Sequence, residues 1–103
     1  MMANGFPYLI ISKAERKKVP KYTAILSKKA QKQLDKLSDK IANPILEAIE
    51  DLENDPRPFG YKKLVDRRGY RIRVGNYRII YDIIDKELII DIITIGDRKD
   101  IYG

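Results

Sequence analysis

The amino-acid sequence predicts an α+β domain, in which an N-terminal strand and a two-helix hairpin pack on an antiparallel β-meander. Three observations support this fold class. Residues 21–27 alternate in polarity and are rich in strand-forming side chains. Apolar residues then recur at helical spacing through residue 52. From residue 69 onward, three strand-like segments are separated by short turns, so the helices precede a run of strands.

The chain of 103 residues is long enough for one small domain with a modest core. We expect the domain to span residues 21–103. Residues 1–20 are apolar at first and then basic up to Pro20, and we expect them to form an N-terminal arm. The arm is either a flexible, disordered extension or an added strand or partner-binding segment.

The composition limits the chemistry. Lys and Arg number 21 against 15 Asp and Glu, and the net charge of +6 favours phosphate-bearing or acidic partners. The chain has neither cysteine nor histidine, which excludes disulfides, thiolate or imidazole metal sites and the usual general base at neutral pH. No metal or cofactor is therefore expected. No segment is long enough to span a bilayer or has the pattern of a secretory signal, so we expect a cytoplasmic protein with no membrane partner.

Two helices are expected after the first strand. Ser27 can cap the first helix, over residues 28–38, through its side-chain oxygen. The second helix presents an apolar face that consists of Ile41, Ile45, Leu46, Ile49 and Leu52. Pro44 leaves two alternatives, because proline removes a backbone donor. The helix begins either at Pro44 after an Asn43 cap, or near Asp39 with a kink at the proline.

The segment GYRIRVGNYRIIY, residues 69–81, predicts a β-hairpin. A two-residue connection with glycine first suits a type II′ turn, so we expect Gly75-Asn76 to join strands at 70–74 and 77–84. In this register Arg73 faces Arg78, and Arg71 lies on the same face. Like charges placed opposite each other cost stability. The face therefore either splays its side chains into water or is built to hold an anion.

A third strand is expected at 87–95, after a turn at Asp85-Lys86, with the first strand at an edge of the sheet. One face of the sheet is then apolar and covered by the helices, with Ile79, Tyr81, Ile83, Leu88, Ile90 and Ile92 in register. Tyr70, Tyr77 and Tyr81 are expected to be packing residues on that face. The other face is expected to be solvated and charged, with Arg71, Arg73, Arg78, Asp82, Glu87 and Asp91.

Three motifs in this order of elements resemble the RelE/ParE toxin superfamily of prokaryotic toxin–antitoxin systems. They are DPRPFG at 55–60, YRIRVGNYRIIY at 70–81 and IGDRKDIY at 95–102. The resemblance covers residues 21–102 and implies a RelE-like fold. For the RelE branch it implies a ribosome-dependent endoribonuclease, an mRNA interferase that cuts mRNA in the A site. The 2′-hydroxyl would attack the adjacent phosphate without a metal ion.

The resemblance also implies a catalytic site. The basic pair on the strand before the glycine turn falls on Arg71 and Arg73, and the arginine of the next strand on Arg78. The arginine after the C-terminal glycine falls on Arg98, and the terminal tyrosine on Tyr102. Fixed guanidinium groups suit the charge that develops in phosphoryl transfer. A tyrosine could stack on a splayed base or move a proton.

Other assignments are weaker. Arg71 and Arg73 could be no more than the solvated face of a strand. Lys62 and Lys63 either bind the RNA backbone or only increase solubility. Several relatives carry a histidine where this chain has Asp97, so no imidazole can transfer the proton here, and the identity of the base is left open.

Three classes of function are open. They are a RelE-like mRNA interferase, a ParE-like inhibitor of DNA gyrase, and a catalytically weak relative that acts within a repressor complex. The full set of arginines and the tyrosine favours the first. In each class we expect a cognate antitoxin, whose acidic, amphipathic segment would dock on the basic face and its isoleucines in a higher-order complex. The first class adds the ribosome and mRNA as partners.

Overall fold

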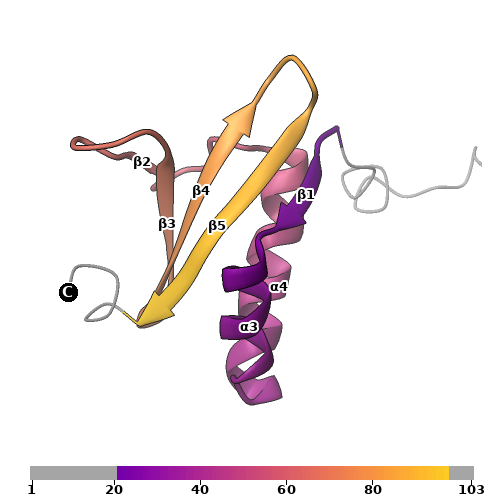
Figure 1. Ribbon diagram of the computed structural model, residues 1–103, viewed down its shortest axis with the longest axis vertical. Helices are drawn as coiled ribbons and strands as arrows, with labels where there is room; N and C mark the ends of the chain where they lie inside the picture. The colour runs from indigo at the N-terminus through magenta and orange to yellow at the C-terminus, as the bar shows by residue number, and fades with distance from the viewer. Residues whose placement is uncertain (1–20, 98–103) are drawn as a thin grey trace, which may run out of the picture.

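The computed structural model describes residues 21–97, which form two helices and one five-stranded sheet (Figure 1). The elements in chain order are β1 (Thr23–Leu26), α3 (Lys28–Asp35), α4 (Asp39–Asn54), β2 (Lys62–Lys63), β3 (Tyr70–Val74), β4 (Tyr77–Ile84) and β5 (Ile89–Asp97). The strand order is β1-β5-β4-β3-β2. Strand β1 lies at an edge and runs parallel to β5, while all other pairs are antiparallel. The predicted α+β class is confirmed, and the predicted N-terminal arm lies outside the described residues.

The core lies between one face of the sheet and the two helices. Buried residues of the sheet meet buried residues of α3 and α4 in a single cluster. The sheet contributes Ile72, Ile79, Tyr81, Ile83, Ile90, Ile92 and Ile95, and the helices contribute Ala30, Leu34, Ala42, Ile45, Ile49 and Leu52. Tyr70 and Tyr77 are half-buried against this cluster, as the alternation of β3 and β4 predicts.

The first helix begins at its predicted cap. The Ser27 hydroxyl accepts a hydrogen bond from Ala30 N, 3.0 Å away, at the start of α3. Helix α4 begins at Asp39 and continues through Pro44, so the second of the two alternatives holds for its start. Its buried stripe is Ala42, Ile45, Ile49 and Leu52. Ile41 and Leu46, predicted to be on this face, lie at the two margins of the stripe and are 38% and 40% exposed.

The turn between β4 and β5 is longer than the sequence predicts. Backbone bonds from Glu87 N to Ile84 O and from Leu88 N to Asp85 O close a turn that occupies residues 85–88. Leu88 has φ +57° and is exposed rather than on the core face. The register also shifts opposite Ile80 and Tyr81, where Ile93 is an extra residue in β5. The bulge restores Ile92 and Ile90 to the core face.

Side chains from the helices cap the edges of the sheet. Beyond the end of β1, Gln33 of α3 takes over the edge of β5: its Oε1 accepts from Ile95 N at 2.7 Å, and its Nε2 donates to Thr94 Oγ1 at 3.0 Å. On the outer edge of β1, the Glu53 carboxylate accepts from Ala24 N at 2.7 Å. Backbone groups that another chain could pair with are thereby occupied.

The second face of the sheet is less solvated than predicted. Arg78, Ile80 and Thr94 on this face are 5%, 1% and 8% exposed. Strand β4 is the central strand, so its outward side chains are flanked on both sides by those of β3 and β5. Other charged residues are more accessible: Arg73 on β3 is exposed, and the exposed Arg68 guanidinium lies 3.1 Å from the Asp82 carboxylate of β4.

Candidate functional site

The arginine hairpin forms as the sequence predicts. The register pairs Arg73 with Arg78 and Arg71 with Ile80 across β3 and β4. Gly75 has φ +61° and Asn76 keeps a negative φ, which is the pattern of a type II′ turn. The turn and the register together place Arg73 and Arg78 opposite each other on neighbouring strands. They lie next to the pair Val74–Tyr77, which closes the hairpin.

The two arginines line a small pocket at the end of the hairpin. Its volume is about 50 Å³, and its walls are Arg73, Gly75, Asn76 and Arg78. Arg78 is buried and lies across from Gly96 of β5, which has no side chain to fill the space beside it. Arg73 is exposed. One guanidinium is thus fixed by its surroundings and the other is accessible to a ligand, an arrangement that can bind a phosphate group.

A row of cations continues from this pocket across β3 to β2. Arg71 pairs with Ile80 on one side and with Lys62 on the other, and cross-strand partners share a face. Lys62 therefore lies on the arginine face. Lys63 pairs with Tyr70 and points to the opposite face, so the two predicted RNA-binding lysines have different environments. The sequence alone could not separate them, because β2 is too short to show a pattern.

Two predicted site residues, Arg98 and Tyr102, lie outside the described residues. Asp82, a carboxylate on the same predicted face as the arginines, is four residues from Arg78 along β4, about 13 Å at ~3.3 Å per residue. Its carboxylate accepts from Ile83 N and contacts Arg68. This geometry removes Asp82 from the arginine pocket.

A network of polar and aromatic side chains fixes the DPRPFG loop. The Tyr81 hydroxyl donates to Pro56 O at 2.7 Å, and burial raises the pKa of Tyr81. The Arg57 guanidinium lies 3.2 Å from the Asp85 carboxylate and 5.6 Å from the centre of the Tyr70 ring. Tyr22 donates to Asp85 at 2.7 Å. The loop is therefore tied to the start of β1, to β3 and to the β4–β5 turn.

These contacts shift the ionisation of the groups in the network. The hydrogen bonds from Tyr22 and Arg57 lower the pKa of Asp85 below 3.8. The bond to Asp85 raises the pKa of Tyr22 and that of Arg57. At neutral pH Tyr22 and Arg57 are therefore protonated and Asp85 is ionised, so the hydrogen bonds of the network are intact.

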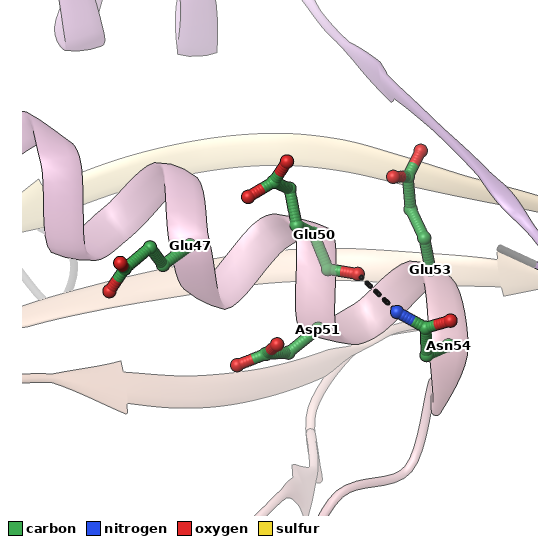
Figure 2. Close-up of a pocket in the computed structure, with 5 residues that line it drawn as sticks. All are labelled: Glu47, Glu50, Asp51, Glu53 and Asn54. Atoms are coloured by element: carbon green, nitrogen blue, oxygen red, sulfur yellow. Dashed lines mark hydrogen bonds between the residues drawn. The ribbon is translucent and has the colours of Figure 1, made fainter. Parts of the chain in front are cut away.

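The outward face of α4 carries the opposite charge. Figure 2 shows Glu50 and Glu53 pointing away from one side of the helix and Asp51 from the other. With Glu47 and Asn54 they line an open, polar hollow of about 400 Å³. The domain is therefore electrically polar: cations cover β2 and β3, and carboxylates cover the C-terminal half of α4.

The fold and the basic hairpin define the class, a toxin of a type II toxin–antitoxin system. The sequence profile of the family described as ParE toxin of type II toxin-antitoxin system, parDE, matches residues 24–102. The chain belongs to this family, within the RelE/ParE superfamily. No curated protein sequence matches the chain. No helix within residues 21–97 is long and apolar enough to cross a membrane.

Solved structures of toxin–antitoxin complexes are similar to the chain. The RelBE2 complex from Mycobacterium tuberculosis has a TM-score of 0.68 at 29% identity, covering 78% of this chain and 100% of that one. The archaeal RelE–RelB complex from Pyrococcus horikoshii OT3 has a TM-score of 0.67 at 31% identity, covering 76% and 96%. The RelB–RelE complex from Methanococcus jannaschii has 0.62 at 28% identity, covering 77% and 95%. The fold prediction is thereby confirmed.

Proposed function

We propose that this toxin is a metal-independent endoribonuclease that cleaves mRNA in the ribosomal A site, in the cytoplasm. The observation that carries the proposal is the pairing of Arg73 with the buried Arg78 beside the hairpin turn. Two guanidinium groups that face each other across neighbouring strands can donate hydrogen bonds to the same anion, and a scissile phosphate is such an anion.

In this cleavage reaction, the role of the described side chains is to donate hydrogen bonds to the phosphate oxygens. The 2′-hydroxyl loses its proton as its oxygen forms a bond to phosphorus, the bond from phosphorus to the 5′-oxygen breaks, and the 5′-oxygen takes up a proton and leaves as a hydroxyl. The products are a 2′,3′-cyclic phosphate and a 5′-hydroxyl end, with no net gain or loss of protons. Negative charge rises on the non-bridging oxygens, which Arg73 and Arg78 would bind, with Arg71 and Lys62 along the RNA backbone. Arg98 and Tyr102 belong to the same proposal as further site residues.

A cognate antitoxin is the partner that we propose for the toxin. The second face of the sheet combines the arginines with Ile25 and Ile93, which are 48% and 37% exposed. An acidic, amphipathic segment matches both properties and would neutralise the arginines as it folds on them. Relatives of similar structure are solved as toxin–antitoxin complexes. A higher-order toxin–antitoxin assembly would follow from such a pairing.

Primer extension on a defined mRNA in a reconstituted translation mixture tests the activity. The wild-type protein is expected to cut within the A-site codon only when ribosomes are present. Arg73→Ala is the main variant, because Arg73 is exposed and its loss leaves the fold intact. We expect cleavage to fall ~100-fold, the typical effect of removing one hydrogen-bond donor to the charge that develops in the transition state. Arg67→Ala, which removes an exposed arginine that does not line the pocket, is the control and should cut normally.

A second candidate is inhibition of DNA gyrase, because the matching family profile is that of ParE toxins. Intact mRNA together with inhibited supercoiling by purified gyrase would select this function over RNA cleavage. Intact mRNA and normal supercoiling would leave the catalytically weak relative as the best account. In either case Arg73→Ala would be expected to weaken binding to the partner, gyrase or the antitoxin, and there would be no cleavage rate to change.

A further inference from the structure

A second pocket shares Arg73 with the arginine pocket. It has a volume of about 340 Å³ and opens between α4, the DPRPFG loop and β3. Its lining is Ala48, Asp51, Pro58, Phe59, Gly60, Ile72 and Arg73.

Phe59 is the most unusual residue of this pocket. Its side chain is fully exposed, at 107% of the reference value, on the rim of the pocket. An aromatic ring left entirely in water does not contribute to the core, and Pro58 restricts the backbone that leads into Phe59. Base–aromatic stacking is worth ~1–3 kcal/mol per base in single-stranded nucleic-acid binding. Phe59 is placed for this contact.

Asp51 supplies the polar group of the same pocket. Figure 2 shows its carboxylate on the opposite side of α4 from Glu50 and Glu53. Within residues 21–97 the Asp51 side chain makes no hydrogen bond or ion pair, and only its backbone oxygen is used, by Asp55 N. A carboxylate is an acceptor with two oxygens, so it selects ligands that present two adjacent donors.

We propose that this pocket binds a single nucleobase, guanine, next to the phosphate held by Arg73 and Arg78. The ring stacks on Phe59 over Ile72 and Ala48. The adjacent N1–H and N2–H donors of guanine bind the two oxygens of Asp51. Adenine, cytosine and uracil do not offer that pair of donors on one edge. The assignment deepens the proposed function, since it gives the RNA site a preference for the base beside the cut.

The charges of the pocket favour a nucleotide over an apolar peptide anchor. A peptide side chain would use Ala48, Phe59 and Ile72 but would leave the Asp51 carboxylate desolvated without a donor, which is unfavourable. A guanine nucleotide instead matches both charges: its phosphate meets Arg73 and its amino group meets Asp51. Arg73 is shared by both pockets, so the two contacts can come from one nucleotide.

Binding of nucleoside monophosphates to the purified protein tests the proposal without any ribosome. NMR titrations with GMP, AMP, CMP and UMP would follow the methyl groups of Ala48 and Ile72 and the ring of Phe59. We expect GMP to perturb all three and to bind most tightly. Phe59→Ala should weaken GMP binding ~10-fold and Phe59→Tyr should retain it. Val65→Ala, which removes another fully exposed apolar side chain, should have no effect.

Asp51→Asn tests the choice of base, with Glu47→Gln as the matched control on the same helix. The variant should lose the preference for GMP and bind the four nucleotides alike. Perturbations confined to Arg73 and Arg78, or equal affinities in the wild type, would overturn the proposal. So would a pocket that responds to an apolar peptide and not to GMP. Loss of RNA cleavage with retained GMP binding would reject the proposed function alone.

Discussion

Tyr81 connects the core of the sheet to the DPRPFG loop. Its ring is fully buried, stacked 5.8 Å from Tyr70, and its hydroxyl donates to a carbonyl of the loop. A buried tyrosine needs such an acceptor, because an unpaired hydroxyl in the core is costly. The carbonyl in turn belongs to buried Pro56, so either partner is left unsatisfied when the other is removed.

Tyr81→Phe is expected to lower the free energy of unfolding by ~1–2 kcal/mol, because Pro56 O loses its donor. Urea denaturation at neutral pH measures this, with Tyr61→Phe as the control, since that partly exposed ring keeps its contact with Tyr70. Burial raises the pKa of Tyr81 in the folded state. Its contribution is therefore complete below pH ~10 and is lost as the pH rises above that value. The gap between wild type and variant should narrow there, and a gap constant to pH 11 would contradict the assignment.

At the scale of an element, the loop that precedes β3 depends on a glycine. Gly69 has φ +119°, and a Cβ atom there would lie 3.0 Å from Tyr81 O. Gly60 also has a positive φ, +91°, but has nothing within 4 Å. We expect Gly60→Ala to cost ~1 kcal/mol from backbone strain alone, and Gly69→Ala to cost clearly more. Thermal unfolding of both variants gives the difference, and equal losses would show that the close approach to Tyr81 is relieved cheaply.

The capped edge of β5 gives a second prediction at this scale. Gln33→Ala removes the acceptor from Ile95 N, and Ile95 is 1% exposed. We expect a loss of ~1–3 kcal/mol and faster hydrogen exchange at the Ile95 amide. Gln31→Ala is the control, because the Gln31 side chain is exposed and, among residues 21–97, bonds to Asp35 on its own helix. An unchanged exchange rate at Ile95 in Gln33→Ala would show that water replaces the glutamine.

Local patterns predicted the elements, and long-range contacts decided what the patterns left open. Alternation over 70–84 and a glycine turn were sufficient for the β3–β4 register, because both signals are local. The bulge at Ile93 and the four-residue turn that leaves Leu88 exposed have no such signal, since a strand with isoleucine at most positions fits several registers. Strand β2 depends on pairing with β3 and is too short to be read alone.

At the scale of the whole molecule, Asp85 connects three distant segments through Tyr22 and Arg57. Its pKa is lowered by their hydrogen bonds, so its contribution to stability is present above pH ~4 and is lost as the pH falls through its folded value. Melting temperatures of wild type and Asp85→Asn should differ at pH 6, and the difference should shrink as the pH falls below ~4. Asp35→Asn, at the exposed end of α3, is the control. A difference that does not shrink as the pH falls below ~4 would mean that the network is not electrostatic.

The candidate site was predictable to the extent that it depends on one hairpin. Arg71, Arg73 and Arg78 follow from register, and the structure places them together as predicted. Phe59 and Asp51 could not be assigned to a pocket with Arg73, because they are on a loop and a helix that meet β3 only in the folded domain. The burial of Arg78 was also not predictable, since it follows from the central place of β4 in the sheet.

Lys62 and Lys63 point to opposite faces of the sheet. Substituting each in turn can therefore distinguish RNA binding by the arginine face from an effect of net charge alone. If RNA lies along the row from Arg78 and Arg73 to Arg71, Lys62 is within that row and Lys63 is behind it. Each phosphate contact to a single strand contributes ~0.7 to the slope of log affinity against log salt. Lys62→Ala should therefore weaken binding of a fluorescent single-stranded RNA and reduce that slope by ~0.7, equally for every sequence. Lys63→Ala removes the same net charge from the neighbouring position and should leave the slope unchanged. Equal slopes in the two variants would mean that the RNA responds to net charge and not to the face that carries the arginines.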